Sequence, residues 1–382
     1  MAQSLRVDVD TCITSRIELL RALQRRGWDV VLVAGIEHPT SACPSLPFRF
    51  IALRQVRIPL LRQLLNIIRV QWVLLRLVAL ERIDHVILDP TFFACGFPLD
   101  VAARLDLIRT RYTLDVRSGL FHRRKNRLAE ALRAPLLRIS IWYGRTILSG
   151  ITTITDLLRD TLRDRYWVPA ERVGVWHSGV SLTHFAPEGP RIDAPELRGK
   201  FVVLYHGTFG SDRGLPEAVA AMELLASNRE IVLVLLGSGV EEPTLRALVR
   251  RRCLRSVHIA PAVPHAEVPR WIRACDVGLI PLADTEVMRS SSPLKLMEYL
   301  AMRKPVIVPR FEAFTQVLEG TRAGIFLDSI SAEAIADAVQ DAWKHRSDLP
   351  GRGAEGRRVV ESRYTWDAQA RRLEDYLSGL VR

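Results

Sequence analysis

The regular alternation of amphipathic segments with short, continuously apolar runs is the feature that most restricts how this chain can fold. Glu18–Arg26 has apolar residues at helical spacing, and the apolar run Asp29–Ala34 follows it closely. Further apolar runs occur at 84–89, 111–116 and 146–155. Runs that do not alternate with polar residues are typical of strands buried on both faces, as in parallel sheets. The pattern therefore predicts a doubly wound α/β fold.

The same pattern restarts after a polar segment rich in proline and glycine, 188–199, which we interpret as a linker. Beyond it we expect strands at 201–206, 231–236, 256–259, 277–281 and 305–309, and helices at 215–225, 241–252, 266–274 and 294–302. Two doubly wound domains follow from this alternation. Such sheets bind ligands beyond the carboxyl ends of their strands, so we also expect a cleft between two facing domains.

Composition excludes several classes of protein. Of the 382 residues, 48% are hydrophobic and 25% charged, which excludes a disordered or fibrous chain. The five cysteines form no C-x-x-C pair, which excludes a disulfide framework and favours a reducing compartment. We find no secretory signal and no run of eighteen apolar residues, and therefore expect a cytoplasmic protein that does not span a membrane.

The positive charge is concentrated in the first half. Residues 1–195 contain 28 basic and 18 acidic residues, whereas residues 196–382 contain 26 and 24. A basic half-chain attracts phosphate-rich partners such as nucleic acid, an anionic lipid surface or a phosphorylated substrate. An arginine-rich surface without a binding role is the alternative. No nucleic-acid recognition motif or interleaved aromatic platform is present, so we expect no nucleic-acid partner.

A stretch within this half, Arg57–Glu81, is almost entirely apolar apart from a narrow arginine stripe. Arg62, Arg69 and Arg76 recur every seven residues and fall on one side of a helix. One interpretation is a helix that packs into the first domain with its arginines in water. The other is a helix at a membrane surface, with its arginines over anionic headgroups.

The segment 276–309 carries the clearest chemical signal. A strand ends near Pro281, a polar loop with three serines follows, and a helix is predicted to begin near Pro293. The N–H groups at a helix start favour an anion, yet Lys295 lies in the first turn, where the helix dipole disfavours a cation. We therefore expect Lys295 to face a bound anion. A diphosphate on Lys295 and the N–H groups, with a ribose hydroxyl on Glu298, fits this arrangement.

Five motifs here resemble, in order and spacing, the retaining GT-B glycosyltransferases of the family-4 type (glycosyl transferases group 1). They are Val173–Phe185, Tyr205–Ala221, Leu233–Leu245, Val257–Leu279 and Ser292–Pro309. The resemblance implies two Rossmann-like α/β domains facing across a cleft, which we place at 1–187 and 196–364. It also implies a tail helix, 365–382, that packs back on the first domain.

Roles for individual residues follow from the resemblance. Glu298 matches the glutamate that holds the donor ribose, and Arg213 matches the basic residue on the donor phosphates. The backbone near Gly207 and Gly210 is expected against the phosphates, and the turn around Val263 against the nucleobase. Ser291, Ser292 and Pro293 occupy the stretch whose backbone amides face the diphosphate in the family.

Three positions depart from the family pattern. The family's first glutamate falls on Ser290, with Glu286 nearby but out of register, and an arginine of the glycine loop falls on Thr208. The segment 10–15 (DTCITS) replaces the glycine-rich N-terminal loop. A subgroup also lacks the first glutamate, so we interpret Ser290 as a sign of subgroup membership.

In the first domain, the segment 114–118 (LDVRS) resembles the family's acidic-x-Arg-acidic segment. Asp115 matches the first acid, Arg117 the arginine, and Ser118 replaces the second acid. A carboxylate there can accept the acceptor's hydroxyl proton or orient the acceptor. An ion pair between Asp115 and Arg117 that locks the loop is the equally weighted alternative. Asp89, at another strand end, is a weaker candidate.

We expect no metal and no cofactor. The pair Asp8 and Asp10 resembles a metal motif of a different fold but lacks its surrounding pattern, and neither His177 nor His206 has a partner at ligand spacing. Arg213, Lys295 and the helix N–H groups would stabilise the leaving diphosphate instead of a metal.

Taken together, the sequence predicts a glycosyltransferase. It would move a sugar, with retention, from a nucleotide-diphosphate sugar to a hydroxyl of a glycan or lipid-linked glycan, at the inner face of an anionic membrane. Two alternatives stay open. One is a nucleotide-sugar epimerase or phosphorylase on the same fold, and the other is a catalytically inactive glycosyltransferase-like binding subunit.

Overall fold

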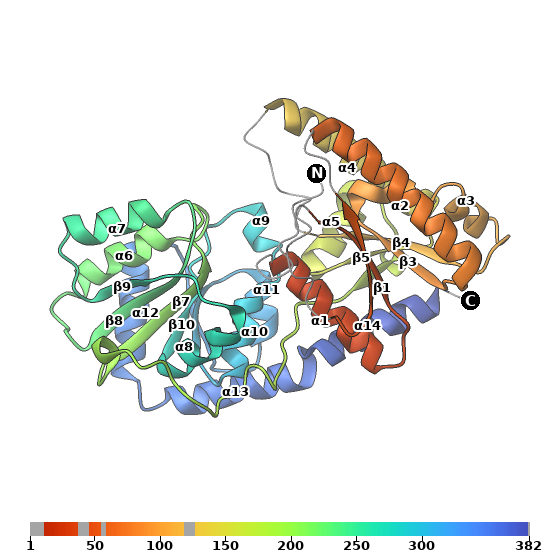
Figure 1. The fold of residues 1–382 in the computed structure, drawn as a ribbon. Coiled ribbons are helices and arrows are strands. Elements are labelled where there is room, and N and C mark those ends of the chain that lie inside the picture. Colours follow the sequence, from red (N-terminus) through yellow and green to blue (C-terminus); the bar gives the residue numbers. More distant parts are fainter. Residues whose placement is uncertain (1–10, 37–45, 55–58, 118–126, 381–382) are drawn as a thin grey trace. The chain divides into compact units, whose positions relative to one another are not determined.

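The chain divides into two compact units in the computed structural model, which describes residues 11–36, 46–54, 59–117 and 127–380 (Figure 1). Unit 1 comprises Met1–Gly179 and Trp366–Arg382, and unit 2 comprises Val180–Thr365. The division after Gly179 precedes the sequence-based boundary at 187. Residues 188–199 belong to unit 2 because Arg273, at the end of a helix of that unit, donates hydrogen bonds to the carbonyls of Ala186 and Pro190.

The described strands of unit 1 form two parallel sheets. β1 (Val31–Ile36) pairs with β2 (Arg49–Arg54). The second sheet has the order β3 (His85–Leu88), β4 (Arg111–Val116), β5 (Gly150–Thr153) and β6 (Val173–Val175). β3 and β4 match the predicted strands, and β5 is shorter than 146–155 because α4 continues to Thr146. β6 was not predicted.

Helices cover both faces of these strands (Figure 1). They are α1 (Thr11–Arg25), α2 (Pro59–Glu81), the 3₁₀ segment η1 (Pro90–Gly96), α3 (Leu99–Arg104), α4 (Arg127–Thr146), α5 (Asp156–Tyr166), η3 (Ala170–Arg172) and α14 (Trp366–Gly379). α1 and α14 pack together on one face, and α2 and α4 lie on the other, where both contact η1. The core of the larger sheet is built on fully buried Tyr112, Leu114 and Ile151.

The last helix, α14, is tied into unit 1 by Tyr376. Its hydroxyl donates to the carbonyl of Arg172 at 2.6 Å and accepts from the N–H of Ile151 at 3.1 Å. The ring lies where a side chain at Gly174 would stand, because a Cβ there would come within 2.4 Å of it. The chain end thus packs on the strands β5 and β6.

Unit 2 is a single six-stranded parallel sheet with the order β12-β11-β10-β7-β8-β9. Its strands are β7 (Phe201–Thr208), β8 (Ile231–Ser238), β9 (Val257–Ala260), β10 (Val277–Leu279), β11 (Val306–Pro309) and β12 (Gly324–Leu327). β7 and β8 are buried along nearly their whole length, which is why their sequences do not alternate. The predicted strands are all present in this unit.

Four helices of unit 2 match those predicted at 215–225, 241–252, 266–274 and 294–302, and the others were not predicted. In chain order, the helices of this unit are η4 (Pro195–Leu197), α6 (Leu215–Leu224), α7 (Glu242–Arg251), η5 (His265–Glu267), α8 (Val268–Ala274), α9 (Glu286–Arg289), α10 (Leu294–Ala301), α11 (Glu312–Leu318), α12 (Ala332–Lys344) and α13 (Leu349–Arg363). The unpredicted helices include α11, α12 and α13, and also α9, which stands where a loop was predicted. The Thr285 side chain accepts from the N–H of Met288 and thereby caps this short helix.

We predict that Tyr376→Phe loosens the β5–β6 edge of unit 1. The substitution leaves the carbonyl of Arg172 and the N–H of Ile151 without their partner, which costs about 1–3 kcal/mol. Native-state hydrogen exchange, read peptide by peptide, should show faster exchange in β5 and β6 and unchanged exchange in β7 and β8. Unaltered protection of β5 would show that the hydroxyl does not hold α14 in place.

Candidate functional site

The order of strands in unit 2 marks one edge as the place for a ligand. From β7 the chain moves outward through β8 and β9 and then returns to the other side of β7 with β10. The connections leaving β7 and β10 therefore diverge at the carboxyl ends of these neighbouring strands, where ligands of open parallel sheets bind. The residues that the sequence singled out, Gly207 and Ser291–Glu298, follow these two strands.

Lys295 lies at this edge, in the first turn of α10, as predicted. It is partly buried, its Nζ donates to the Tyr205 hydroxyl at 2.9 Å, and Nζ lies 4.1 Å from the centre of the Tyr205 ring. The side chain crosses the backbone of Gly207, where an added Cβ would come within 2.6 Å of Lys295 Cε. Gly207 also has a φ of +119°, so both the close approach and the backbone conformation require glycine.

A second cation, Arg213, acts on Lys295 through its charge. Burial and the neighbouring guanidinium of Arg213 lower the pKa of Lys295 to about 7. Arg213 itself lies beside Asp212, with Nε 3.2 Å from Oδ1, and its Nη1 contacts the sulfur of Met288 at 3.5 Å. An anionic ligand at this strand end would offset the effect of Arg213 on Lys295 and favour the charged form of the amine.

Glu298 lies one turn further along α10, on the same side as Lys295. It is 93% buried as a side chain, and two histidines bracket its carboxylate: Oε1 is 3.0 Å from His265 Nε2 and Oε2 is 3.4 Å from His206 Nε2. Burial acts to raise the pKa of Glu298, but the hydrogen bond from His265 and the nearby positive charges outweigh it and lower the pKa. Glu298 is therefore an ionised acceptor held in a fixed orientation.

The two histidines differ in their own surroundings. Burial lowers the pKa of His206 to about 4, so this ring is neutral at neutral pH. His265 is half exposed and stacks on His184, with 5.2 Å between ring centres. His265 follows the turn that contains Val263, whose side chain is partly buried against the core of unit 2. His265 thus links the turn around Val263, predicted to contact the nucleobase, to Glu298, predicted to bind the ribose.

The remaining predicted residues of unit 2 lie around this edge. Gly210 precedes Arg213, and a Cβ at Gly210 would come within 2.9 Å of Asp212 Oδ1. Ser292 and Pro293 lead directly into α10. The Ser291 N–H was predicted to face a ligand. In the structure it donates instead to the carbonyl of Met288 at 3.2 Å and closes the turn after α9.

Ser290 and Thr208, the two positions where this chain lacks a charged residue of the family pattern, make hydrogen bonds within unit 2. Ser290 is fully buried at the end of α9, where its hydroxyl donates to the carbonyl of Val287 at 3.0 Å. The Thr208 side chain is exposed, and its carbonyl accepts from the Tyr205 hydroxyl at 2.7 Å. Neither position therefore supplies an acid or a cation to the site.

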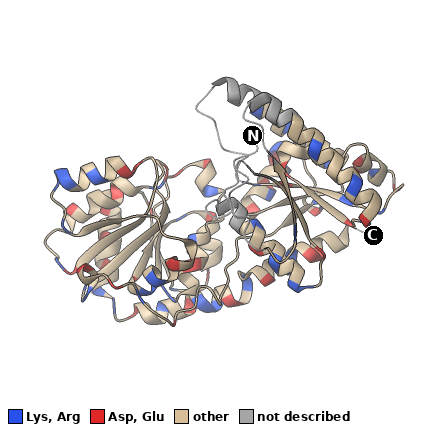
Figure 2. Ribbon diagram, viewed as in Figure 1, with Lys and Arg blue, Asp and Glu red and all other residues tan. Residues whose placement is uncertain are grey.

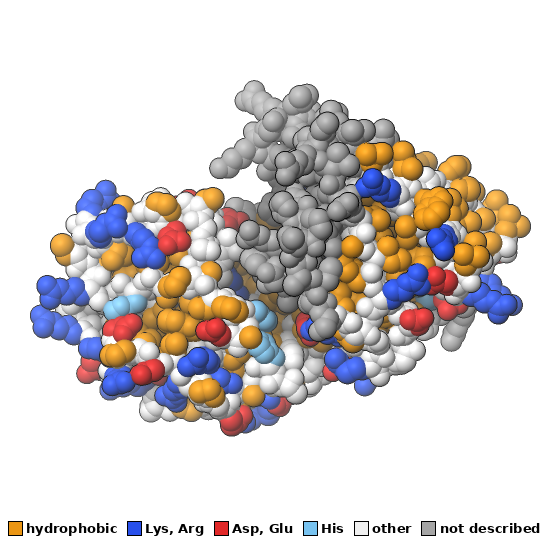
Figure 3. Space-filling view, viewed as in Figure 1, with side chains coloured by type: hydrophobic (Ala, Val, Ile, Leu, Met, Phe, Trp, Pro, Cys, Tyr) orange, Lys and Arg blue, Asp and Glu red, His pale blue; other side chains and the backbone are white. Residues whose placement is uncertain are grey.

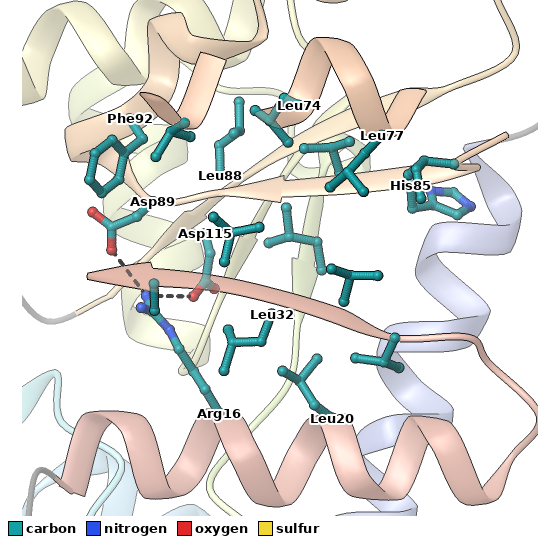
Figure 4. Close-up of a pocket in the computed structure, with 18 of the residues that line it drawn as sticks. Arg16, Leu20, Leu32, Leu74, Leu77, His85, Leu88, Asp89, Phe92 and Asp115 are labelled. Atoms are coloured by element: carbon teal, nitrogen blue, oxygen red, sulfur yellow. Dashed lines mark hydrogen bonds and ion pairs between the residues drawn. The ribbon is translucent and has the colours of Figure 1, made fainter. Parts of the chain in front are cut away.

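In unit 1, the predicted residues Asp89 and Asp115 converge with Arg16 of α1 (Figure 4), and Arg117 contacts Asp115. Arg16 bridges the two acids, at 3.0 Å from Asp89 and 3.4 Å from Asp115. Arg117 donates to Asp115 at 2.9 Å and to Ser15 at 3.2 Å, and its guanidinium lies 4.6 Å from the centre of the Trp176 ring. The structure therefore contains the ion pair that was one of the two interpretations of this segment.

The chemistry open to Asp115 follows from this setting. The side chain is 94% buried and also accepts from the Thr152 hydroxyl at 3.0 Å. Burial acts to raise the pKa of Asp115, but the charges of Arg117 and Arg16 outweigh it and hold the pKa below its ordinary value. A carboxylate of low basicity is a poor proton acceptor. Its charge and position suit it better to orienting Arg16 and Arg117.

A cavity of about 410 Å³ adjoins this cluster (Figure 4). It lies between β1 and β3, which belong to different sheets, and aliphatic side chains such as Leu32, Leu74 and Leu88 form most of its wall. Arg16, Asp89 and Asp115 stand together at one end. The acidic and basic groups of unit 1 are thus placed beside an apolar space.

Four residues of these clusters were not singled out as site residues from sequence. They are Arg16, Tyr205, His206 and His265. His206 stands at a strand end, which was a usable signal, but His265 is 33 residues from Glu298 and only the fold brings them together. Asp8, Asp10 and Ser118 lie outside the described residues. Within the described ranges, no group of three His, Cys, Asp or Glu side chains could hold a metal ion.

Sequence comparisons agree with this architecture. Residues 14–184 match the profile of Glycosyltransferase Family 4, and residues 200–345 match that of Glycosyl transferases group 1. The chain is 26% identical over 223 residues to the alpha-D-kanosaminyltransferase of Streptomyces kanamyceticus, a match that covers 56% of each protein. It is 28% identical over 253 residues to a GDP-mannose-dependent alpha-(1-6)-phosphatidylinositol monomannoside mannosyltransferase of Mycobacterium tuberculosis, covering 62% of this chain and 65% of that protein.

A comparison of structures gives the same fold. Anabaena HepE, solved in complex with UDP and glucose, superposes with a TM-score of 0.70 at 12% identity, covering 95% of both chains. The two family profiles together span most of the chain, which therefore belongs to the GT-B glycosyltransferases of the family-4, group 1 type. The predictions of this family and of a two-domain, Rossmann-like α/β fold are confirmed. The matched stretches span between about half and two thirds of the curated relatives named above.

We predict that Lys295 takes up a proton when an anion binds. With a pKa of about 7, its amine is mostly neutral at pH 8, and a diphosphate beside it favours the charged form. The affinity for a nucleoside diphosphate should therefore fall as pH rises above 7. Calorimetry at pH 8, in two buffers of different ionisation enthalpy, should show uptake of up to one proton.

The control is Lys295→Met, which has no ionisable group at this position. Ionisation of the nucleotide itself is common to both proteins, so the difference between them isolates Lys295. Equal proton uptake by the two proteins would show that this amine does not respond to the ligand.

Proposed function

We propose that this protein transfers a sugar from a nucleotide-diphosphate sugar to a hydroxyl group of a glycan or lipid-linked glycan. The observation that carries the proposal is the pairing of partly buried Lys295 with Arg213 at the carboxyl end of β7, one helical turn from the fixed carboxylate of Glu298. Two cations followed, one helical turn further on, by a carboxylate are complementary to a diphosphate joined to a ribose. The family and the relatives named above support the same class of reaction.

In this proposal the donor binds on unit 2. Lys295, Arg213 and the N–H groups at the start of α10 hold the diphosphate against the backbone of Gly207 and Gly210. Glu298 accepts a hydrogen bond from the ribose, and the turn around Val263 lies beside the base. As the sugar leaves, the same cations stabilise the charge that develops on the diphosphate. This assigns the leaving-group role to the protein's own charges and requires no metal or cofactor.

The acceptor side is assigned to unit 1. Asp115 and Arg117, with Arg16 and Asp89, offer charged groups that can orient an acceptor next to an apolar space. Retention of configuration is supported only by the type of family that the chain resembles. We also assign the protein to the inner face of an anionic membrane, consistent with the basic first half of the chain and with a named relative whose acceptor is a phosphatidylinositol mannoside.

We predict that Lys295→Ala and Arg213→Ala each lower turnover ten-fold or more. Each removes a charge that stabilises the leaving group, and a factor of ten corresponds to about 1.4 kcal/mol. Release of nucleoside diphosphate from a donor sugar measures the rate, once a panel of nucleoside diphosphates tested by thermal shift has identified the base. Lys344→Ala, at an exposed position of α12, is the matched control. Unchanged rates in both site variants would remove the proposed phosphate site.

We further predict that Glu298→Ala separates ribose recognition from phosphate recognition. Loss of the carboxylate should weaken the binding of a nucleoside diphosphate ten-fold or more and leave the affinity for inorganic pyrophosphate unchanged. Lys295→Ala should weaken both ligands. Calorimetry with the two ligands measures this contrast. If Glu298→Ala lowers both affinities equally, the carboxylate acts by shaping the phosphate site and not by holding the ribose.

A further inference from the structure

Large apolar side chains are exposed mainly on unit 1. Of the thirteen such side chains among the described residues, eleven belong to this unit, and only Leu224 and Val240 belong to unit 2. Six of the eleven lie on α2 and α4, which cover the same face of the unit 1 strands (Figure 1). The exposure is therefore concentrated in one layer of one unit, which scattered surface residues would not produce.

On α2, the exposed side of the helix is itself apolar. Val70, Leu74 and Leu77 are buried, spaced three and four residues apart, and face the strands. The opposite side exposes Ile68, Trp72 and Leu80, by 53% to 69% of their surface, together with Arg69 and Arg76. The predicted arginine stripe therefore shares its face with large apolar groups. Figure 3 shows hydrophobic side chains gathered over α2 and interrupted by basic ones.

On α4, the exposed side has the same composition. Leu136, Ile139 and Trp142 follow one another at three-residue spacing and are 47% to 55% exposed, and Arg138 lies beside them. Both helices contact η1, and Phe97, which follows η1, is exposed as well. We refer to the surface formed by Ile68, Trp72, Leu80, Leu136, Ile139 and Trp142 as the α2–α4 face.

The charged residues of α2 and α4 are predominantly basic. From 59 to 80 the charged residues are Arg62, Arg69 and Arg76, and from 131 to 149 they are Arg133, Arg138 and Arg145. The acidic residues of the two helices are Glu81, the last residue of α2, and Glu130, near the start of α4. Figure 2 shows basic positions recurring along α2. Arg76 extends over Trp72, with 5.6 Å between its guanidinium carbon and the ring centre. Tryptophan and arginine with aliphatic groups between them have the composition of helices that lie in a bilayer interface.

We propose that the α2–α4 face docks on an anionic lipid bilayer. The apolar side chains enter the boundary between headgroups and acyl chains, and the arginines remain among the phosphates. The charge decides between this occupant and a second copy of the chain. A symmetric dimer would bring the same predominantly basic face against itself, and like charges across an interface disfavour the pair.

In this proposal the protein binds the membrane surface as a peripheral protein and does not cross the bilayer. No helix in the described part of the chain is both long and apolar enough to cross a membrane. The inference stands on the surface of unit 1 alone and does not depend on the donor site of unit 2. If the proposed function also holds, the acceptor side of the protein would be held at the lipid surface.

Vesicle co-sedimentation of the full chain tests the inference. Vesicles of phosphatidylcholine with 30 mol% phosphatidylglycerol, roughly the charge density of an anionic leaflet, should bind the protein at least ten-fold more tightly than phosphatidylcholine alone. Trp72→Ala with Trp142→Ala should weaken this binding ten-fold or more. Arg69→Glu with Arg76→Glu should abolish the preference for phosphatidylglycerol, and added salt should weaken binding of the unchanged protein.

Two matched variants control for general effects of apolarity and charge. Leu224→Ala with Val240→Ala removes the exposed apolar groups of unit 2, and Arg250→Glu with Arg251→Glu reverses charge on α7. Neither should change vesicle binding. Nucleoside diphosphate affinity should be the same in all variants, which shows that they are folded and separates this test from that of the donor site.

Three results would overturn the proposal. The first is the absence of binding to either type of vesicle, and the second is equal binding by the unchanged protein and the α2–α4 variants. The third is a dimer, seen by analytical ultracentrifugation, that the two tryptophan substitutions dissociate. That result would assign the α2–α4 face to a second copy of the chain.

Discussion

The close approach of α10 to the carboxyl ends of β7 and β10 is the constraint on which the arrangement of unit 2 depends. Two glycines make it possible. Lys295 crosses Gly207, and the ring of Tyr299 lies against Gly278, where a Cβ would come within 2.6 Å of it. The Tyr299 hydroxyl then donates to the carbonyl of Leu204 at 2.6 Å. Because the helix is held flat against both strands, its first turn is positioned at the point where the strand order reverses.

The position of α10 brings together charged groups whose proximity lowers the stability of the folded protein. Lys295 is partly buried beside Arg213, and burial lowers the pKa of Lys295 and of His206. A partly buried amine costs free energy in the empty protein, and an anion removes that cost. The same groups therefore lower stability before binding and are already oriented when the ligand arrives, which is the usual compromise at a functional site. Glu298 differs because the hydrogen bond from His265 stabilises its charge before any ligand is present.

Local sequence signals predicted the elements but not the contacts between them. The strands of unit 2 were predictable because buried parallel strands are continuously apolar, and the start of α10 because Pro293 precedes it. His265 and Arg16 were missed because each reaches its partner across 33 or more residues. On α2, the period of the arginines predicted which side faces outward. It did not predict that Ile68 and Trp72 share that side, because a helix this apolar has no unique buried face until η1 and the strands pack on it.

The placement of α14 has a consequence for how the chain is made. Unit 1 consists of two pieces of sequence, and its last helix is synthesised only after the whole of unit 2. Leu373 and Leu377 of that helix are buried, and Gln369 accepts from the N–H of His177. On the ribosome, the second unit can reach its native state while the first still lacks a piece of its packing. The half of the protein that begins the chain is thus the half that is completed last.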